Sequence, residues 1–518
     1  MKTQTLLERH ARAIRGTLEC FDRVLLAGTY AAIGWPGAML GYLCARGIDV
    51  REFAAQWANP WRAEINRHVR AVAREERVEV RQVRPNDRKE EVVAEILARR
   101  GGKPGVVCVL GAMERCRSFR AVQKLSGGWE VAWDRGHCQH FYIYLLDPEF
   151  GLCHLRIPTW APFRLQFCCN GHDWLEHQLK AAGLRYRKAD NCFTHVQDLA
   201  AAQKLVRHFD PRRLHARLDE LAARWLKVHP LLGDSLHWSI AQAEWSTDIL
   251  FKNGAVLPEL FRELVRTATV EVQAEDIYRF LGKQPHPRRR SGPETRLQTF
   301  VQGTRLKHSL GATSLKIYDK AGSVLRIECT TRDVTTFTHH RQVKPRRSAA
   351  PSESREGAGS RGPAVKKWAP MRKTFYNLGA LGRALSACNR RYLAYLSQWR
   401  DHTCERQELR AITQSCRDEK GRSVRGVNFF REDDLCFLHA LQRGEHQIGG
   451  LRNRTLQPHL PGWSAPKIGR TLRRFRTLQL LKRVRGTRKY YPTARGENLI
   501  IAGLQLKERI ILPHLRAA

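Results

Sequence analysis

Four residues suited to phosphoryl-transfer chemistry alternate with apolar residues in the stretch Thr304–Thr331. They are Lys316, Tyr318, Arg326 and Glu328. The alternation has a period of two, which predicts two half-buried strands and places the four side chains on one face. A phenol can attack phosphorus, a carboxylate can hold a divalent metal ion, and cations can offset the charge of a phosphate. The alternative is an ordinary solvated face of a sheet.

The register of this hairpin sets the distance between the tyrosine and the carboxylate. The residues Lys320-Ala321-Gly322 predict a three-residue turn with Gly at its left-handed position. Such a turn pairs Asp319 with Ser323, and therefore Tyr318 with Val324. Glu328 then lies about four residues further along the strand, roughly 13 Å from Tyr318. We expect no direct contact between the two side chains, but a bound phosphate would fit between them.

Other carboxylates offer a second candidate site. In the stretch AEWSTDILF, Glu244 and Asp248 are four residues apart, which puts them on one face of either a helix or a strand. Asp22, Asp147 and Glu149, with either Asp248 or Glu244, would form a carboxylate cluster for two-metal phosphodiester cleavage. Turn chemistry explains Asp147 and Glu149 equally well, and capping explains Asp22. The cofactor implied by either site is Mg²⁺ or Mn²⁺.

The charge balance of the whole chain predicts a polyanionic partner. The 518 residues include 90 Lys and Arg against 50 Asp and Glu, a net charge of +40. The positive charges repel one another unless the protein binds a polyanion, and nucleic acid is the commonest polyanion. We expect DNA rather than RNA as the partner and no membrane. No run of eighteen apolar residues and no secretory signal is evident, so a cytoplasmic, nucleoid-associated protein is expected.

The C-terminal part predicts a winged helix-turn-helix domain. Helices are expected at 432–441, 451–460 and 467–480, followed by a short hairpin at 481–492 and a last helix from about 494. Residues 451–490 carry twelve Lys and Arg and no acid, which is typical of a nucleic-acid interface. The expected contacts are Lys467, Arg470, Arg473, Arg474 and Arg476 in the recognition helix, with Arg485, Arg488 and Lys489 in the wing.

Upstream, strands are expected at 105–111, 129–133, 140–146, 153–159 and 163–168 among helical stretches. This mixture predicts an α+β fold with a mostly antiparallel sheet. We divide the chain into an N-terminal α+β domain (1–235), an α+β continuation with the hairpin (236–340), a flexible linker rich in Pro, Gly and Ser (341–367), a helical connector (368–425) and the winged-helix domain (426–518). The fourteen cysteines are scattered without metal-site spacing, so reduced thiols are expected. We find no internal repeat of the solenoid kind.

Two resemblances add to these expectations. The run LKIYDKAGSVLRIE resembles a segment of the trans-acting plasmid rolling-circle replication initiators and related phage initiators. That resemblance implies that Tyr318 is a nucleophile that attacks DNA and that Glu328 is a metal ligand. It also implies that Asp248 is an acid of an earlier strand that helps to hold the metal. The HxH metal motif of the broader nicking family is not found near these residues.

The chain as a whole resembles a set of uncharacterised bacterial proteins that are long, basic and end in a winged helix. The stretches that carry this resemblance are FDRVLLAG, YLLDPEFGL, NGHDWL, AEWSTDILF and KIYDKAGSVLRIE. It would suit a mobile-element protein. The sequence therefore predicts a DNA-binding protein with metal-dependent nicking or strand-transfer activity. The alternative is a DNA-binding transcriptional regulator without catalysis, whose large N-terminal region binds a partner or ligand.

Overall fold

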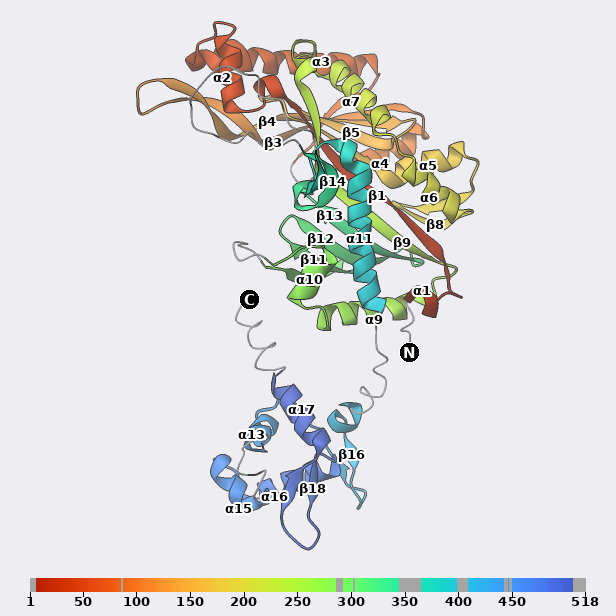
Figure 1. Cartoon of the computed structure of the whole chain (residues 1–518), viewed down its shortest axis with the longest axis vertical. Helices are drawn as coiled ribbons and strands as arrows, with labels where there is room; N and C mark the ends of the chain where they lie inside the picture. Colours follow the sequence, from red (N-terminus) through yellow and green to blue (C-terminus); the bar gives the residue numbers. More distant parts are fainter. Residues whose placement is uncertain are drawn as a thin grey trace. The chain divides into compact units, whose positions relative to one another are not determined.

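The computed structural model describes residues 6–84, 87–285, 292–300, 303–343, 365–397, 409–441, 446 and 450–505. The chain divides into two compact units, Met1–Trp399 and Arg400–Ala518 (Figure 1). The first unit is a mixed α+β structure built on one eleven-stranded sheet, as the sequence predicted at the level of fold class. Among the described helices, none combines the length and hydropathy of a membrane span.

The large sheet has the strand order β10-β11-β12-β13-β9-β1-β6-β5-β4-β3-β2. Every neighbouring pair is antiparallel except β2 and β3. The strands are β1 (Ile14–Tyr30), β2 (Val80–Gln82), β3 (Gly105–Gln123), β4 (Trp129–Asp147), β5 (Gly151–Pro158), β6 (Leu165–Asn170), β9 (Leu236–Phe251), β10 (Glu294–Phe300), β11 (Gly303–Leu310), β12 (Thr313–Lys320) and β13 (Val324–Thr331).

Two halves of the sheet repeat the same topology around its centre. In each half a long strand, β1 or β9, is followed by helices and then by a four-stranded meander, β3–β6 or β10–β13. The last strand of each meander returns beside the long strand, and β1 pairs with β9 at the middle. The two halves therefore share one strand topology on either side of the β1–β9 pair. The amino-acid sequence gives no sign of this repeat, because it lies in strand order and not in residue identity.

Helices cover both faces of the sheet. The helices of the first unit are α1 (Leu6–Arg9), α2 (Pro36–Cys44), α3 (Asn59–Glu75), α4 (Lys89–Arg100), α5 (Gly171–Ala181), α6 (Leu199–Arg207), α7 (Pro211–Trp225), α8 (His229–Leu232), α9 (Leu257–Val270), α10 (Ala274–Phe280) and α11 (Leu378–Ser397). The main core joins one face of the sheet to α2, α3, α7, α9, α10 and α11. A smaller core joins the other face to α5, α6 and the small hairpin β7 (Tyr186–Ala189) and β8 (Cys192–Val196).

The ambiguous stretch 236–251 is a strand, β9, at the centre of the sheet. Its residues from Ala243 to Phe251 are all buried because strands pair on both sides and core packs on both faces. Since β9 pairs with β1, the two regions predicted as 1–235 and 236–340 share a single sheet. The predicted strands at 105–111 and 140–146 are confirmed as parts of β3 and β4. The strand predicted at 153–159 is confirmed as β5, which begins at Gly151 and ends at Pro158.

The register predicted for the 304–331 hairpin is wrong by two residues. Lys320 pairs with Val324 across the turn Ala321-Gly322-Ser323, so that Tyr318 lies opposite Arg326. Ala321 and Gly322 both have positive φ, which moves the turn one residue later than expected. The face assignments survive because a shift of two residues preserves the side to which each side chain points.

Much of the predicted linker, 341–367, lies outside the described residues. The strands on either side of it, β14 (Thr338–Val343) and β15 (Val365–Pro370), pair with each other. The helix that follows, α11, is part of the main core of the first unit. The division between the compact units falls later, between Trp399 and Arg400.

The second unit has its own hydrophobic core. Its described elements are β16 (Cys416–Arg417), β17 (Ser423–Val424), α13 (Glu432–Leu441), α15 (Asn453–Leu456), α16 (Ala465–Thr477), β18 (Leu481–Arg483), β19 (Tyr490–Pro492) and α17 (Ala494–Gln505). Ser464 caps α16 by accepting a hydrogen bond from the backbone N–H of Lys467. The strands β18 and β19 form a hairpin, and Leu451 pairs with Tyr490 beside it.

The packing of α11 on the sheet gives a test of the first unit. A Cβ on Gly382 would lie 2.5 Å from the indole ring of Trp245, whereas a Cβ on Gly379 would meet only the far end of Arg383, 3.9 Å away. Gly382→Ala should lower the free energy of unfolding by about 1–3 kcal/mol through overpacking. Gly379→Ala should leave it unchanged or raise it by up to about 1 kcal/mol through helix propensity. Urea denaturation measures both, and equal stabilities would contradict this packing.

Candidate metal centre

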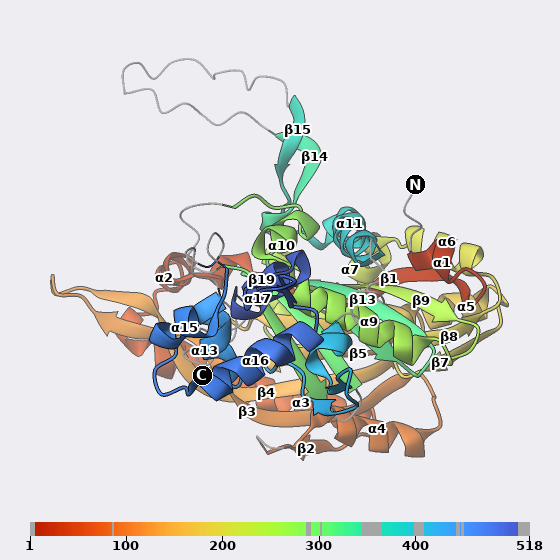
Figure 2. The ribbon, with the colours of Figure 1, turned by 90° about the horizontal axis from the view of Figure 1, so that it is seen from below.

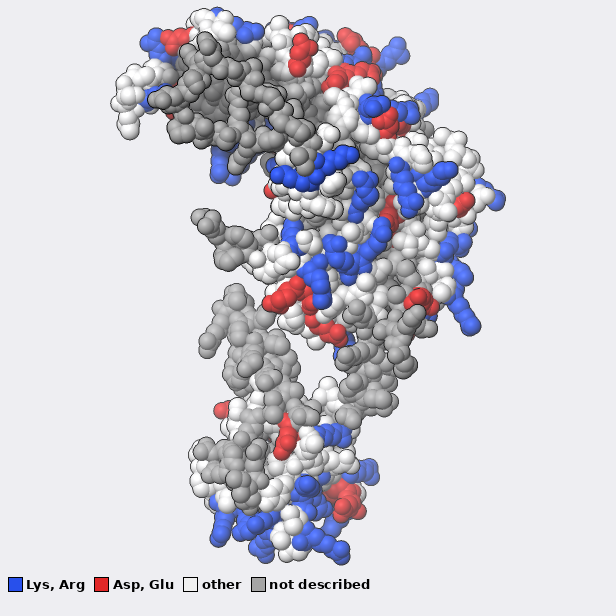
Figure 3. Space-filling model, viewed as in Figure 1, with Lys and Arg blue, Asp and Glu red and all other residues white. Residues whose placement is uncertain are grey.

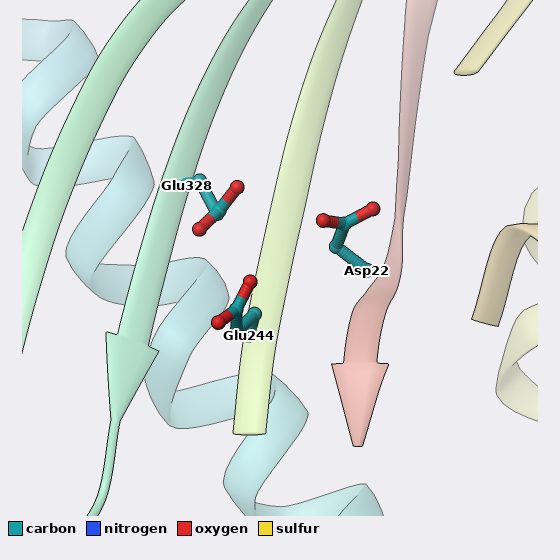
Figure 4. A group of neighbouring side chains, drawn as sticks. All are labelled: Asp22, Glu244 and Glu328. Carbon is teal, nitrogen blue, oxygen red and sulfur yellow. The ribbon is translucent and has the colours of Figure 1, made fainter. Parts of the chain in front are cut away.

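Three carboxylates converge from three neighbouring strands at the centre of the sheet (Figure 4). Glu244 lies on β9, Glu328 on β13 and Asp22 on β1. Strand alternation brings Glu244 and Glu328 to the same face, where Glu328 lies opposite Ser246, two residues from Glu244. Asp22 is the extra residue of a β-bulge between Phe21 and Arg23, and bulges re-aim side chains in this way.

The spacing of the three carboxylates fits a divalent metal ion. One oxygen from each side chain lies within 4.8 Å of one from each of the others. Two oxygens on opposite sides of an octahedral Mg²⁺ are about 4.2 Å apart, so small side-chain movements suffice. The donor set consists only of carboxylate oxygens, which suits Mg²⁺ or Mn²⁺ and not a soft metal.

A buried arginine holds the strands that carry these acids. Arg326 has no exposed surface and donates two hydrogen bonds to Asp248, Nε to Oδ1 and Nη2 to Oδ2, each 2.7 Å long. Its Nη1 donates to Asp22 Oδ1 at 3.1 Å, and its Nη2 also reaches the carbonyl of Asn191 at 2.7 Å. Arg326 therefore ties β13 to β9, to β1 and to the β7–β8 turn.

Asp22 receives its donors on one oxygen. Besides Arg326, the side chain of Asn191 donates to Oδ1 at 2.7 Å, and Nδ1 of the buried His172 lies 3.2 Å away. Among the contacts of the described residues, none involves Oδ2, which is the oxygen left for a metal ion. Burial favours a higher pKa for Asp22, but the hydrogen bond with His172 and the charge of Arg326 outweigh it and lower the pKa below its usual range. Asp22 is thus a carboxylate at neutral pH.

The pKa of Glu244 is shifted in the opposite direction to that of Asp22. Burial raises its pKa, and the nearby charge of Glu328 raises it further. Its hydrogen-bond donor is the side-chain amide of Gln242, 2.5 Å from Oε1. A divalent cation between Glu244 and Glu328 would relieve the repulsion between their charges.

Tyr318 is in direct contact with the third acid. Its hydroxyl donates to Glu328 Oε2 at 2.6 Å, and Lys316 forms an ion pair with Oε1 of the same carboxylate. The predicted separation of roughly 13 Å is therefore wrong, because the true register brings Tyr318 two residues closer to Glu328. Burial and the charge of Glu328 raise the pKa of Tyr318 well above its ordinary value. The phenol is protonated at neutral pH, and Glu328 is placed to accept its proton.

The other predicted site residues lie elsewhere or act differently. Asp248 gives both oxygens to Arg326 and does not belong to the three-carboxylate group. Asp147 lies in the β4–β5 turn, where it accepts hydrogen bonds from the backbone of Glu149 and from Arg217. Neither acid of that turn is among the clustered carboxylates, and Asp147 accepts backbone hydrogen bonds within the turn, as turn chemistry predicts. Arg326 is buried by its acidic partners and not open to a phosphate.

Three residues around the centre were not predicted as site residues. His172 and Asn191 come from the segments that cover this face, and no spacing in the sequence links them to the acids. Asn389 of α11 lies behind the sheet, fully buried, and its amide donates to the carbonyls of Trp245 at 3.0 Å and Ile327 at 3.1 Å. It thereby holds together the two strands directly beside Glu244 and Glu328.

In the second unit, basic side chains gather around the end that carries β18 (Figure 3). Of the predicted contacts, Arg470, Arg473, Arg485 and Arg488 are exposed. Lys467 is partly exposed and pairs with Asp433 at 3.0 Å, while Arg476 lies 3.5 Å from Glu419, and Lys489 is half-buried. Arg474 differs from these, because it turns inward to the buried Asp434 at 2.6 Å and its side chain is only 13% exposed.

Comparisons of the chain with protein families, with curated proteins and with solved structures return no match.

The raised pKa of Glu244 gives a test of the metal centre. Because the folded state favours its protonated form, the ionised carboxylate costs stability at neutral pH. Glu244→Gln should therefore raise the melting temperature of the metal-free protein at pH 7.

The same variant should also lose the stabilisation by metal. Mg²⁺ or Mn²⁺ at about 100 times its Kd adds about 2.7 kcal/mol to the free energy of unfolding of a protein that binds it. Wild type should gain this and Glu244→Gln should not. The control is Glu52→Gln, a change at an exposed acid. A wild-type melting temperature indifferent to both ions would mean that the three acids hold no metal.

The arginines of α16 should separate into two classes. Arg474→Ala should lower the stability of the second unit by about 1.5–3 kcal/mol, because it removes a charged hydrogen bond to the buried Asp434. Arg470→Ala and Arg473→Ala should leave stability unchanged. If the second unit binds DNA as the sequence predicts, they should also weaken that binding and make its salt dependence shallower. Thermal melts and fluorescence anisotropy distinguish the classes, and a uniform loss of stability in all three variants would contradict this division.

Proposed function

We propose that the protein cleaves DNA at a phosphodiester bond, with Tyr318 as the nucleophile and with a divalent metal ion held by Asp22, Glu244 and Glu328. The observation that carries this proposal is the 2.6 Å hydrogen bond from the Tyr318 hydroxyl to Glu328, one of the three clustered acids. A candidate nucleophile, its base and a candidate metal site thereby lie side by side. The resemblance of the LKIYDKAGSVLRIE segment to rolling-circle initiators supports the same assignment.

In the proposed reaction Tyr318 gives its proton to Glu328 and its oxygen attacks phosphorus. A bond forms between Tyr318 Oη and phosphorus while a deoxyribose oxygen leaves and takes up a proton, so that the DNA is left joined to the protein. A bound Mg²⁺ or Mn²⁺ supplies Lewis-acid polarisation of the phosphate. Lys316 holds Glu328 and can offset charge at the phosphate. Arg326 orients Asp22 through its hydrogen bond and does not touch the substrate.

For the second unit we propose a winged helix that contacts duplex DNA. Its support is the order α13, α15, α16, the β18–β19 hairpin and α17, with a single β-bridge between Leu451 and Tyr490 beside the hairpin. In this arrangement α16 would enter the major groove and the hairpin would be the wing. Arg470 and Arg473 on α16 and Arg485 and Arg488 on the hairpin are exposed as this geometry requires. A mobile-element protein would need both of these activities, since one unit would bind a DNA site and the other would cut DNA.

The second candidate is a DNA-binding regulator without catalysis. One observation favours it: Glu328 already accepts hydrogen bonds from Tyr318, Lys316 and Thr330. A carboxylate that is saturated in this way can serve as a structural element of a sheet. The two candidates differ in whether the chain cuts DNA and in whether it binds a metal ion at the three acids.

Tyr318→Phe should remove the covalent adduct between protein and DNA and slow cleavage by at least about 10³-fold. The assay incubates the full chain with single-stranded and supercoiled DNA and Mg²⁺ or Mn²⁺, and detects the adduct on a denaturing gel. The rate should rise with pH, because the raised pKa keeps the phenol protonated at neutral pH.

The matched control is Tyr142→Phe. Tyr142 also donates to a glutamate, Glu114, at 2.7 Å, but lies on β4, away from the three acids. It should cleave as wild type does. If Tyr318→Phe cleaves normally, the nucleophile is wrongly assigned, and if no variant cleaves any DNA, the regulator is the better account.

A further inference from the structure

The hairpin of β3 and β4 extends beyond the rest of the sheet as a two-stranded arm (Figures 1 and 2). The two strands stay paired out to Gln123 and Trp129. Their outer neighbours end much earlier, since β2 reaches only Gly111 of β3 and β5 reaches only His140 of β4. From about residue 113 to residue 139, both strands therefore lack a further strand beside them.

The acidic residues of this arm all lie on one of its two faces. Residues directly opposite each other share a face, and successive residues alternate. One face carries Met113, Arg115, Arg117, Phe119, Trp133, Arg135 and His137, whereas all three acids of the arm, Glu114, Glu130 and Asp134, lie on the other. The first of these faces therefore has three arginines and no carboxylate.

These arginines have no acidic partner in the described part of the chain. None of Arg115, Arg117 and Arg135 forms an ion pair there, and all three are exposed. A fourth arginine, Arg164, lies close enough that the charge of Arg117 adds to burial in lowering its pKa. Like charges gathered without a counter-ion repel one another, and a bound polyanion would remove that repulsion.

The same face offers flat groups for stacking. The Arg117 guanidinium lies over the ring of Trp133, 3.7 Å from its centroid, and Trp133 in turn packs on the buried Phe119 at 4.7 Å. Trp133 remains 37% exposed, and Trp129 at the end of the arm is 40% exposed. Nucleobases stack on indole rings and on guanidinium planes, and only unpaired bases present their faces for this.

We propose that this face of the β3–β4 arm binds single-stranded DNA, with Arg115, Arg117 and Arg135 on phosphates and Trp133 against a base. The proposal rests on the DNA-processing function given above and adds to it a second contact surface. Phe119, on the basic face of the arm, belongs to the same core as Trp245 and Ile327, so these three side chains lie on one face of the sheet. Glu244 and Glu328 are the chain neighbours of Trp245 and Ile327, and strand alternation places them on the opposite face. The arm thus contacts DNA away from the phosphate that is cleaved.

The first test measures binding of a fluorescent oligothymidine to the full chain, in a Tyr318→Phe background so that no cleavage interferes. The triple variant Arg115→Ala, Arg117→Ala, Arg135→Ala should lose at least tenfold in affinity. Its salt slope should fall by about 2, since each phosphate contact on a single strand contributes about 0.7. Arg120→Ala is the matched control, because Arg120 lies on the other face of the same arm, 3.9 Å from Asp134. Equal affinity of the triple variant and this control would overturn the proposal.

The second test locates the contact directly. An oligonucleotide that carries 5-iododeoxyuridine is cross-linked by light to wild type, and the tryptic peptides are identified by mass spectrometry. Adducts should fall on the peptide 125–135, which contains Trp129 and Trp133. They should persist in Trp133→Phe, which keeps a stacking ring, and weaken in Trp133→Ala. Adducts confined to the second unit would overturn the proposal.

These experiments can refute the cleavage assignment and the arm-binding proposal separately. A protein that does not cut DNA but still cross-links through the arm retains the binding surface and loses only the nuclease assignment. A protein that cuts DNA and gives no arm cross-link retains the nuclease and loses the arm.

Discussion

The bidentate pair between Arg326 and Asp248 is the constraint on which the centre of the structure depends. Both side chains are buried, Arg326 completely, so neither charge could be accommodated without the other. Breaking a buried pair of this kind costs about 3–5 kcal/mol, because an uncompensated charge remains in the interior. The same guanidinium also reaches Asp22 and Asn191, so one residue fixes the relative positions of β13, β9, β1 and the β7–β8 turn. The three carboxylates of the candidate metal centre sit on the strands aligned by this residue.

The repeated topology of the sheet explains why the centre lies where it does. Each half contributes a long strand, and these strands pair at the middle, where covering segments pack on both faces. Irregularities interrupt both long strands: β1 has an extra residue at Asp22 and another register shift between Ile14 and Gly16, and β9 has an extra residue between Ile240 and Gln242. The halves carry different side chains. β6, the counterpart of β13, has no carboxylate among Leu165–Asn170, so Glu328 has no equivalent on that strand of the first half.

The basic residues behind the net charge of +40 are used differently in the two units. In the first unit many of the cations lie in ion pairs or, on the β3–β4 arm, on one acid-free face. In the second unit the exposed arginines of α16 and of the β18–β19 hairpin are placed around one end, while Arg474 is used to hold Asp434 in the interior. Arginine thus serves as an internal tie in Arg326 and Arg474 and as a surface charge elsewhere, which a count of basic residues cannot separate.

The sequence by itself determined the α+β class with a mostly antiparallel sheet, most strands of the first meander, the order of elements in the C-terminal part, and the common face of Lys316, Tyr318, Arg326 and Glu328. These follow from local periodicity, and the face assignment is unchanged by a register error of two residues. Only the tertiary structure decided that Tyr318 contacts Glu328. That contact depends on the position of the turn, and the observed turn lies one residue later than the predicted one. It also decided that Asp22 and Glu244, 222 positions apart in the chain, complete the carboxylate group, and that Asp248 belongs to Arg326. Those outcomes depend on the pairing of β1 with β9 and on a bulge, and long-range pairing leaves no periodic signal in the residues that it brings together.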